Sequence, residues 1–105
     1  MRITFLGTGT SQGIPVIGCD CVVCKSDNHK NIRSRSSIFI DCHLGKILID
    51  TGPDLRMQLL ENSIDDIDYI LYTHEHNDHT AGLDDIRPIN FRNQKIVKAY
   101  GLERV

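Results

Sequence analysis

Apolar residues along the chain fall into short runs whose spacing predicts strands in alternation with helices. Residues 2–7 are rich in β-branched and aromatic side chains and end in glycine, a pattern typical of a strand that enters a turn. Runs of the same kind predict four further strands at residues 36–42, 46–50, 66–73 and 95–101. Gly45 lies between the first two of these runs, where it can adopt the turn conformation that closes a hairpin.

Two segments have the spacing of amphipathic helices. Residues 51–63 place three leucines on one face, with Pro53 at a favourable first-turn position. Residues 78–87 predict a second helix, and we expect Pro88 to end it, because proline disrupts the hydrogen-bond ladder inside a helix. The longest loop, residues 11–36, follows neither period, so some further interaction must hold it in place.

The order of these elements predicts an α/β fold with a mixed sheet. Helices are expected on one face of the sheet, and no segment supplies a layer for its other face. The chain also ends just after a predicted strand, at a point where another helix could start. We therefore expect residues 1–105 to be a truncated part of a single larger domain.

Composition narrows the class of protein. Hydrophobic residues make up 40% of the chain and charged residues 25%, which is typical of a soluble globular domain. No apolar run approaches the roughly 20 residues that cross a bilayer, and the N-terminus lacks a signal-peptide pattern, so we expect a cytoplasmic protein without a membrane partner. The net charge of -2 does not favour nucleic acid as a partner, although Lys30, Arg33 and Arg35 form a small basic cluster that could hold a phosphate.

Cysteines in a chain without an export signal are more often metal ligands or catalysts than disulfide partners. Three of the four, Cys19, Cys21 and Cys24, lie together in the long loop and are its obvious restraint. The alternative is a chance group of reduced thiols. Cys42 and the adjacent His43 have no partner motif, so we expect both to have packing or surface roles.

The segment from His74 to His79 carries the clearest chemical signal. His74 and His76 are two residues apart at the end of a predicted strand, so their side chains leave the same side of the backbone. Asp78 and His79 follow where the chain turns into a helix, which brings a carboxylate and a third imidazole to a neighbouring point. Four such groups are more than one catalytic ion takes from so short a segment, which indicates two metal ions. The alternative is a chance cluster of structural histidines.

The sequence THEHNDH resembles the His-x-His-x-Asp-His signature of the metallo-β-lactamase superfamily, and LIDTGPD resembles that family's earlier aspartate motif. The resemblance implies the N-terminal half of a four-layer αββα hydrolase fold. It implies that His74 and His76 bind one metal ion and that Asp78 and His79 bind the other, with Asp78 also orienting the nucleophilic water. Asp50 would hydrogen-bond a metal ligand and fix its tautomer. The alternative for Asp50 is a strand-ending residue that accepts backbone N–H bonds.

The stretch GTGTSQGIPVIGCDCVVC resembles the opening of the phosphoribosyl cyclic phosphodiesterases. In that family a Cys-x-Cys-x2-Cys loop binds a structural zinc, so the resemblance implies one zinc ion on Cys19, Cys21 and Cys24. The family's fourth ligand is a histidine near the C-terminus that this chain does not contain, and His29 is a weaker local candidate. The implied activity is hydrolysis of a small cyclic phosphodiester by hydroxide held between two divalent ions, zinc or manganese. The remaining ligands would follow Val105, so the 105-residue chain alone is expected to be inactive and poorly stable.

Three other functions stay open. The cofactor-maturation protein of pyrroloquinoline quinone synthesis has a similar cysteine loop, and the tRNA 3′-processing endonucleases resemble this chain in FLGTG and in the metal motif. The complete histidine signature disfavours the first function, and the cysteine triplet disfavours the second. The third is a non-catalytic zinc-binding assembly module that pairs through an exposed sheet edge, an arrangement that would also allow a homodimer.

Overall fold

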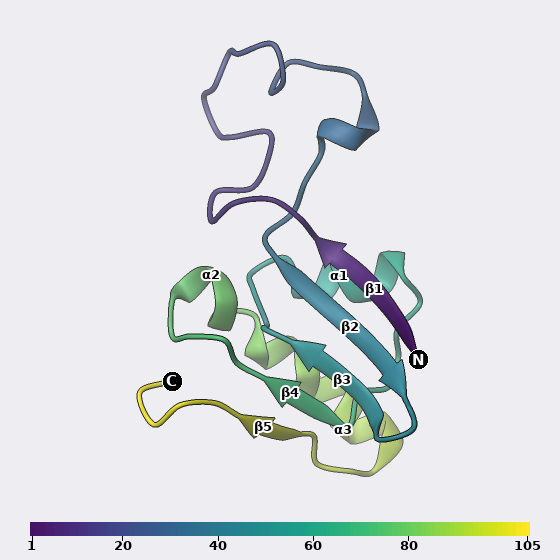
Figure 1. Ribbon diagram of the computed structural model, residues 1–105. Helices are drawn as coiled ribbons and strands as arrows, with labels where there is room; N and C mark the ends of the chain where they lie inside the picture. Colours follow the sequence, from purple (N-terminus) through teal and green to yellow (C-terminus); the bar gives the residue numbers. More distant parts are fainter.

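The computed structural model describes residues 1–105, and its centre is one five-stranded mixed sheet (Figure 1). The strands lie side by side in chain order and have the bounds β1 (Arg2–Gly7), β2 (Ser37–Cys42), β3 (Gly45–Ile49), β4 (Tyr69–Leu71) and β5 (Lys98–Tyr100). The first three strands pair antiparallel, whereas β4 pairs parallel to β3 and β5 pairs parallel to β4. The predicted α/β class and mixed sheet are therefore confirmed, as is the hairpin of β2 and β3, in which Gly45 has a φ of 126°.

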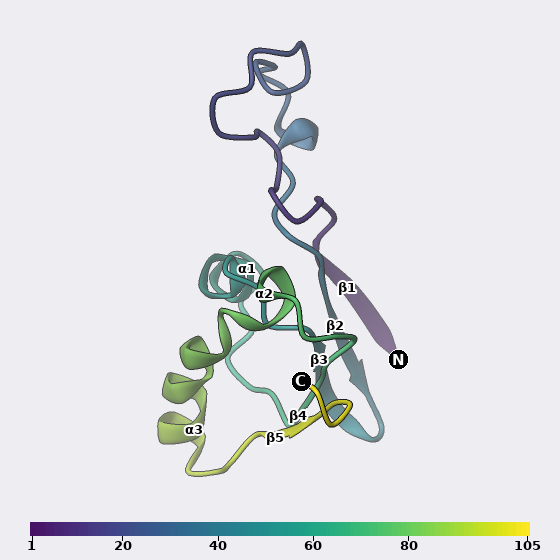
Figure 2. The same cartoon turned by 90° about the vertical axis from the view of Figure 1, so that its left-hand side faces the viewer.

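Short helices connect the later strands and cover one face of the sheet. Their bounds are α1 (Leu55–Glu61), α2 (Asn77–Thr80), η2 (Leu83–Ile86) and α3 (Arg87–Asn93), where η denotes a 3-10 helix. A further 3-10 helix, η1 (His29–Asn31), lies in the loop between β1 and β2. Figure 2 shows α1 and α3 on the same side of the sheet, which confirms the prediction that helices occupy a single face. None of these helices combines the length and the apolar character that a bilayer crossing needs.

The hydrophobic core lies between the sheet and this helical layer. Strands β1 to β4 contribute side chains to it from one face of the sheet, because successive side chains of a strand point to opposite faces, whereas no residue of β5 is buried. Leu48 of β3 and Ile70 of β4 pair directly, and both are almost completely buried. The helical layer contributes apolar side chains at Leu55, Leu59, Ile86 and Ile89. These contacts fix the positions of β3 and β4, whose ends carry the candidate site.

The opposite face of the sheet is also apolar, and no helix of the chain lies over it (Figure 2). On β1, Phe5 is 68% exposed and Ile3 is 50% exposed. The paired positions next to Phe5 continue the apolar surface across the other strands at Ile38, Ile49, Leu71 and Tyr100. The uncovered face agrees with the sequence, which contains no further segment to cover it.

The structure corrects several details of the predicted helices. The prediction that Pro88 ends a helix is wrong, because Pro88 lies in the first turn of α3, where its missing N–H needs no partner. The helix predicted over residues 78–87 is interrupted at Gly82, between α2 and η2. Pro53 lies just before α1 and not in its first turn. Local spacing cannot predict the break at Gly82, because its cause is a close approach to the distant Gly52.

The long loop between β1 and β2 projects away from the body of the protein (Figure 1). Two isolated bridges hold its stem, one between Gly9 and Arg35 and one between Ile14 and Arg33. Beyond the second bridge, between Ile14 and Arg33, the short helix η1 is the only regular element. The cysteine triplet lies in this projecting segment, where backbone hydrogen bonds form local turns, one of them from the N–H of Cys19 to the carbonyl of Val16 at 3.0 Å.

Charged side chains next to β4 make the stability of the fold depend on pH. Lys95 forms ion pairs with Asp66 and with Asp68, the latter at 2.7 Å, and these bonds hold the pKa of both carboxyls below the usual range. A lowered carboxyl pKa stabilises the fold above the ordinary value of about 4, and this stabilisation is lost as the pH falls through the folded-state pKa.

We therefore expect the free energy of unfolding of Lys95→Met to fall less steeply than that of the wild type between about pH 5 and pH 2. Urea unfolding at a series of pH values measures both slopes. Lys98→Met removes an exposed lysine of β5 and should keep the wild-type slope. Equal slopes for the wild type and Lys95→Met would show that the ion pairs do not set the acid sensitivity.

Candidate metal centre

The candidate metal ligands lie at one edge of the sheet, beyond the ends of β3 and β4. Because these two strands are parallel, the segments that follow them leave the sheet at the same edge. Asp50 follows β3, and its N–H donates to the carbonyl of Leu71 at 3.0 Å. The N–H of Thr51 donates to the carbonyl of His79 at 2.8 Å. Backbone hydrogen bonds therefore hold the segment from His74 to His79, called the histidine motif below, against the loop that follows β3.

Asp50 is a buried carboxylate at the centre of this arrangement, with only 3% of its surface exposed. Its Oδ1 accepts the N–H of Thr73 at 2.8 Å, and its Oδ2 accepts both the Thr73 hydroxyl and His79 Nδ1, each at 2.7 Å. The φ of Asp50 is 63°, in the left-handed region that aspartate adopts at some cost. Strained backbone of this kind persists where many contacts determine it, and it is enriched at functional sites.

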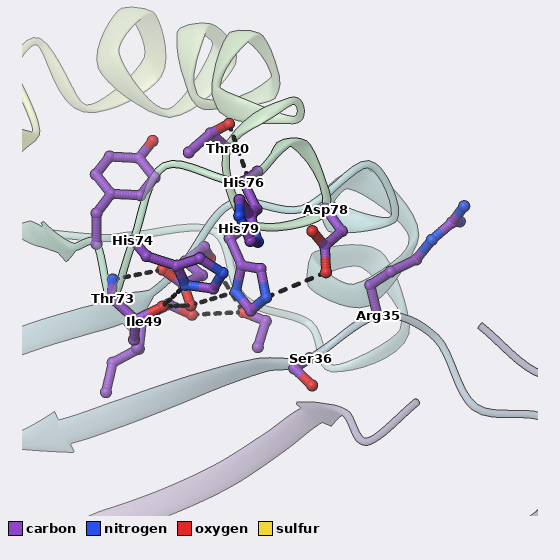
Figure 3. A network of polar contacts seen from close by, with 12 residues as sticks. Arg35, Ser36, Ile49, Thr73, His74, His76, Asp78, His79 and Thr80 are labelled. Atoms are coloured by element: carbon purple, nitrogen blue, oxygen red, sulfur yellow. Dashed lines mark hydrogen bonds and ion pairs between the residues drawn. The ribbon is translucent and has the colours of Figure 1, made fainter. Parts of the chain in front are cut away.

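The three histidines of the motif lie close together beside this carboxylate (Figure 3). The ring centroid of His74 is 4.5 Å from that of His76 and 4.1 Å from that of His79. His74 Nδ1 lies 2.9 Å from the Thr73 hydroxyl, so its Nε2 is the nitrogen left for another partner. His76 is exposed and lies at the N-cap of α2. The structure therefore brings together the three imidazoles that the sequence singled out.

Asp78 lies beside His79 in α2 and provides the carboxylate of the motif. Its Oδ2 is 3.1 Å from His79 Nε2, whereas His79 Nδ1 is bonded to Asp50. In a neutral ring that donates through Nδ1, Nε2 carries a lone pair, so two acceptor atoms then face each other across 3.1 Å. A cation bound by both atoms would remove that repulsion. Because zinc and manganese accept imidazole nitrogen and carboxylate oxygen, the residues present fit a divalent metal ion.

Two glycines let the loop after β3 approach the histidine motif closely. A Cβ on Gly52 would lie 2.4 Å from the carbonyl oxygen of Asp78, and a Cβ on Gly82 would lie 2.0 Å from the carbonyl oxygen of Gly52. The N–H of Gly82 also donates to the carbonyl of Thr51 at 2.8 Å. The absence of side chains at both glycines therefore helps to fix where the backbone of Asp78 lies.

Arg35 lies beside Asp78 at the rim of the centre (Figure 3), but its charge is already paired. Its backbone N–H and its Nη1 donate to the two carboxylate oxygens of Asp54, at 2.9 and 3.0 Å, and its Nε donates to the carbonyl of Ser11 at 3.0 Å. Arg33 instead donates to the Thr8 hydroxyl. The basic cluster predicted from the sequence is therefore divided, and Arg35 joins the loop stem to the segment before α1.

The cysteine triplet forms a second group of ligands in the projecting loop. The sulfur atoms of Cys19, Cys21 and Cys24 all lie within 4.8 Å of one another, whereas His29 and Cys42 are not part of this group. The backbone N–H of Cys24 donates to the sulfur of Cys21 at 3.4 Å, and this bond is the main cause that lowers the pKa of Cys21 to about 7. A thiolate is the form of cysteine that binds metals, so the cluster fits a zinc ion.

Thr73 is the residue of the centre that sequence analysis missed. Its hydroxyl lies between Asp50 and His74, within 2.9 Å of both. The sequence contains one indication of this role, a residue with a hydroxyl group directly before the first histidine of the motif. That signal is weak, because threonine is common in strands and nothing local shows that a buried carboxylate lies opposite it.

Comparison with known proteins finds several relatives. A family model described as the β-lactamase superfamily domain matches residues 45–105. An octanoyltransferase of Porphyromonas gingivalis is 48% identical over 100 residues, which make up 94% of this chain and 20% of that protein. The crystal structure of a diphosphatase from the PhnP family is 48% identical, with a TM-score of 0.84, over 89% of this chain and 37% of that one.

A more distant structure has the same fold. Zinc-bound PqqB from Methylobacterium extorquens superposes with a TM-score of 0.72 at 22% identity, over 97% of this chain and 49% of that one. The chain therefore spans 20% of the length of the octanoyltransferase, 37% of the diphosphatase and 49% of PqqB.

Proposed function

This chain belongs to the β-lactamase superfamily, and on that premise we propose that it carries the metal-binding motif of a hydrolase that acts on small phosphodiesters. The proposal depends on one observation, that the His74 ring packs against the rings of His76 and His79, while His79 contacts both Asp78 and the buried Asp50. The 48% identity to a PhnP-family diphosphatase supports a phosphorus-containing substrate. Because the chain spans 37% of that structure, the proposed activity is that of the full-length protein.

The residues of the motif divide between two metal ions in this proposal. His74 and His76 hold the first ion, and Asp78 and His79 hold the second. Zinc or manganese held by these residues would supply a water of lowered pKa and would neutralise charge on the phosphoryl oxygens. Asp50 holds His79 through Nδ1 and so directs its Nε2 towards the metal. Asp78 accepts a hydrogen bond from the attacking water and orients it.

The cysteine cluster has a structural role in the same proposal. Cys19, Cys21 and Cys24 supply three thiolates of a four-coordinate zinc site, and a further ligand completes it. A closed site of this kind stabilises a loop without taking part in chemistry. It therefore accounts for how a long projecting segment keeps a defined conformation.

A second candidate function is the hydrolysis of a diphosphate. The PhnP-family neighbour is described as a diphosphatase, and its identity of 48% makes its substrate class a specific alternative. Two metal ions can clamp the attacking and leaving oxygens of a phosphoanhydride as they do those of a diester. The two candidates share the same metal centre and differ in the leaving group.

The test compares substrates on the full-length protein loaded with zinc or manganese. We expect a five-membered cyclic phosphodiester of ribose to be hydrolysed with the highest kcat/KM, ahead of a linear diester, a nucleoside diphosphate and a precursor tRNA. Chelation of the metals should remove the activity. A preference for the diphosphate would favour the second candidate, whereas tRNA cleavage or no turnover at all would contradict both.

Metal content separates the hydrolase from a non-catalytic zinc-binding module. We expect Cys21→Ser to lower the zinc content by one ion per chain and to leave the two ions of the histidine motif in place, because the two groups of ligands lie on separate segments. Elemental analysis of the full-length protein measures this. Cys42→Ser, outside the cluster, should keep all three ions. Loss of all metal in Cys21→Ser would favour the module.

A further inference from the structure

We propose that Thr73 is a positioning residue that holds the His74 ring in its Nδ1–H tautomer, and that Asp50 and Thr73 together link the ligands of the two metal ions. The inference rests on the proposed function, since it concerns ligands of the same centre. Three contacts carry it, from Asp50 to Thr73, from Thr73 to His74, and from Asp50 to His79.

The tautomer of His74 follows from counting hydrogens. A threonine hydroxyl has one hydrogen to donate and two lone pairs to accept with. The Thr73 hydroxyl donates to Asp50 Oδ2 at 2.7 Å, because a carboxylate oxygen can only accept. The same hydroxyl lies 2.9 Å from His74 Nδ1 and has no hydrogen left for it. His74 must therefore donate through Nδ1, which leaves the lone pair on Nε2.

A similar count of hydrogens determines the tautomer of His79. Asp50 Oδ2 also accepts His79 Nδ1–H, so His79 likewise presents its Nε2. One carboxylate oxygen thus orients His79 directly and His74 through the hydroxyl between them. Because His74 and His79 belong to different metal ions in the proposed centre, Thr73 and Asp50 couple the two halves of it.

The position of Thr73 is itself well determined. Its N–H donates to Asp50 Oδ1 at 2.8 Å, so the main chain and the hydroxyl of one residue bind both oxygens of the same carboxylate. Asp50 is in turn held by its backbone bond to Leu71 and by burial. A hydroxyl held in this way has little freedom to turn away from the His74 ring.

The experiment first measures tautomers in the metal-free full-length protein. Nitrogen-15 NMR at about pH 8.5, above the ordinary histidine pKa of about 6.5, should show His74 protonated on Nδ1. Thr73→Val removes the hydroxyl at nearly the same volume and should shift His74 towards the Nε2–H form. Thr73→Ser keeps the hydroxyl and should restore the wild-type spectrum. Thr4→Val makes the same change on the edge strand β1 and should leave His74 unaffected.

Metal binding gives the second measurement. Loss of a hydrogen bond to a metal ligand typically changes the metal affinity by about 10–100-fold. We therefore expect Thr73→Val to lower the affinity for one of the two ions by that factor and to leave the affinity for the other near its wild-type value. Competition with a coloured chelator measures both affinities. Asp50→Asn keeps the shape of the residue and tolerates its positive φ, and it should weaken both ions.

Two results would overturn the inference. One is a wild-type protein with His74 protonated on Nε2, which needs no variant and so does not depend on the folding of one. The other is Thr73→Val with an unchanged His74 tautomer or unchanged affinities for both ions. The proposed function fails separately, if His74→Ala binds metal as well as the wild type does.

Discussion

Replacing His79 with alanine is expected to cause the largest loss of activity of any single change in the protein. The ring of His79 bridges Asp50 and Asp78, through contacts of 2.7 and 3.1 Å. Its removal takes away a proposed metal ligand and leaves a buried carboxylate oxygen with one donor fewer. We expect kcat/KM to fall by more than the roughly 10–100-fold that is typically lost when a residue that hydrogen-bonds a metal ligand is replaced.

The measurement is kcat/KM of the full-length protein, together with its metal content. His43→Ala is the matched control, because His43 is an exposed histidine in the turn between β2 and β3. It should keep both the activity and the metal. Full metal content in His79→Ala, or equal activity losses in the two variants, would show that the histidine motif is not the metal site.

Replacing Gly52 with alanine is expected to damage both stability and the metal centre. The new Cβ would meet the carbonyl oxygen of Asp78 at 2.4 Å, and this atom belongs to the backbone and cannot rotate away. Relief requires the loop after β3 to move away from α2, which displaces Asp50 from His79. Inserting a methyl group into a packed site typically costs about 1–3 kcal/mol, and we expect a loss of unfolding free energy in this range.

Denaturant unfolding and metal affinity should therefore both change in Gly52→Ala. Gly101→Ala provides the comparison, because the atoms nearest to a Cβ there are side-chain atoms, at 3.2 Å or more. That variant should have nearly wild-type stability and metal affinity. If Gly52→Ala instead retained full stability and full metal affinity, the close approach of the two segments would not be needed for the centre.

The parts of the fold that the sequence predicts are those that local spacing determines. The hairpin follows from two apolar runs around Gly45, and both α1 and the one-sided helical layer follow from amphipathic spacing. The lengths of β4 and β5, three residues each, were overestimated. Apolar residues that flank these strands pack against the core from loops, so periodicity alone extends the strands too far.

The same distinction holds for the candidate centre. The ligands could be predicted because His74 to His79 lie within one short segment and their residue types suit a metal ion. The position of Thr73 could not, because its partner Asp50 lies 23 residues away and meets it only through the pairing of β3 with β4. The ion pair of Arg35 with Asp54 could not be predicted either, because these residues are 19 positions apart and meet only in the folded chain.

The parallel pairing of β3 and β4 also makes the stability of the fold depend on metal in the proposed centre. The loop after β3 and the motif after β4 meet only once the strands have paired, so an unfolded chain lacks the contact of Asp50 that orients His79. A metal ion that binds the folded form more tightly than the unfolded chain stabilises the fold by mass action, by at most about 2.7 kcal/mol at 100 times its Kd. In the proposed centre, the metal-free protein would therefore unfold more often than the metal-bound protein, and a protease would cleave it faster.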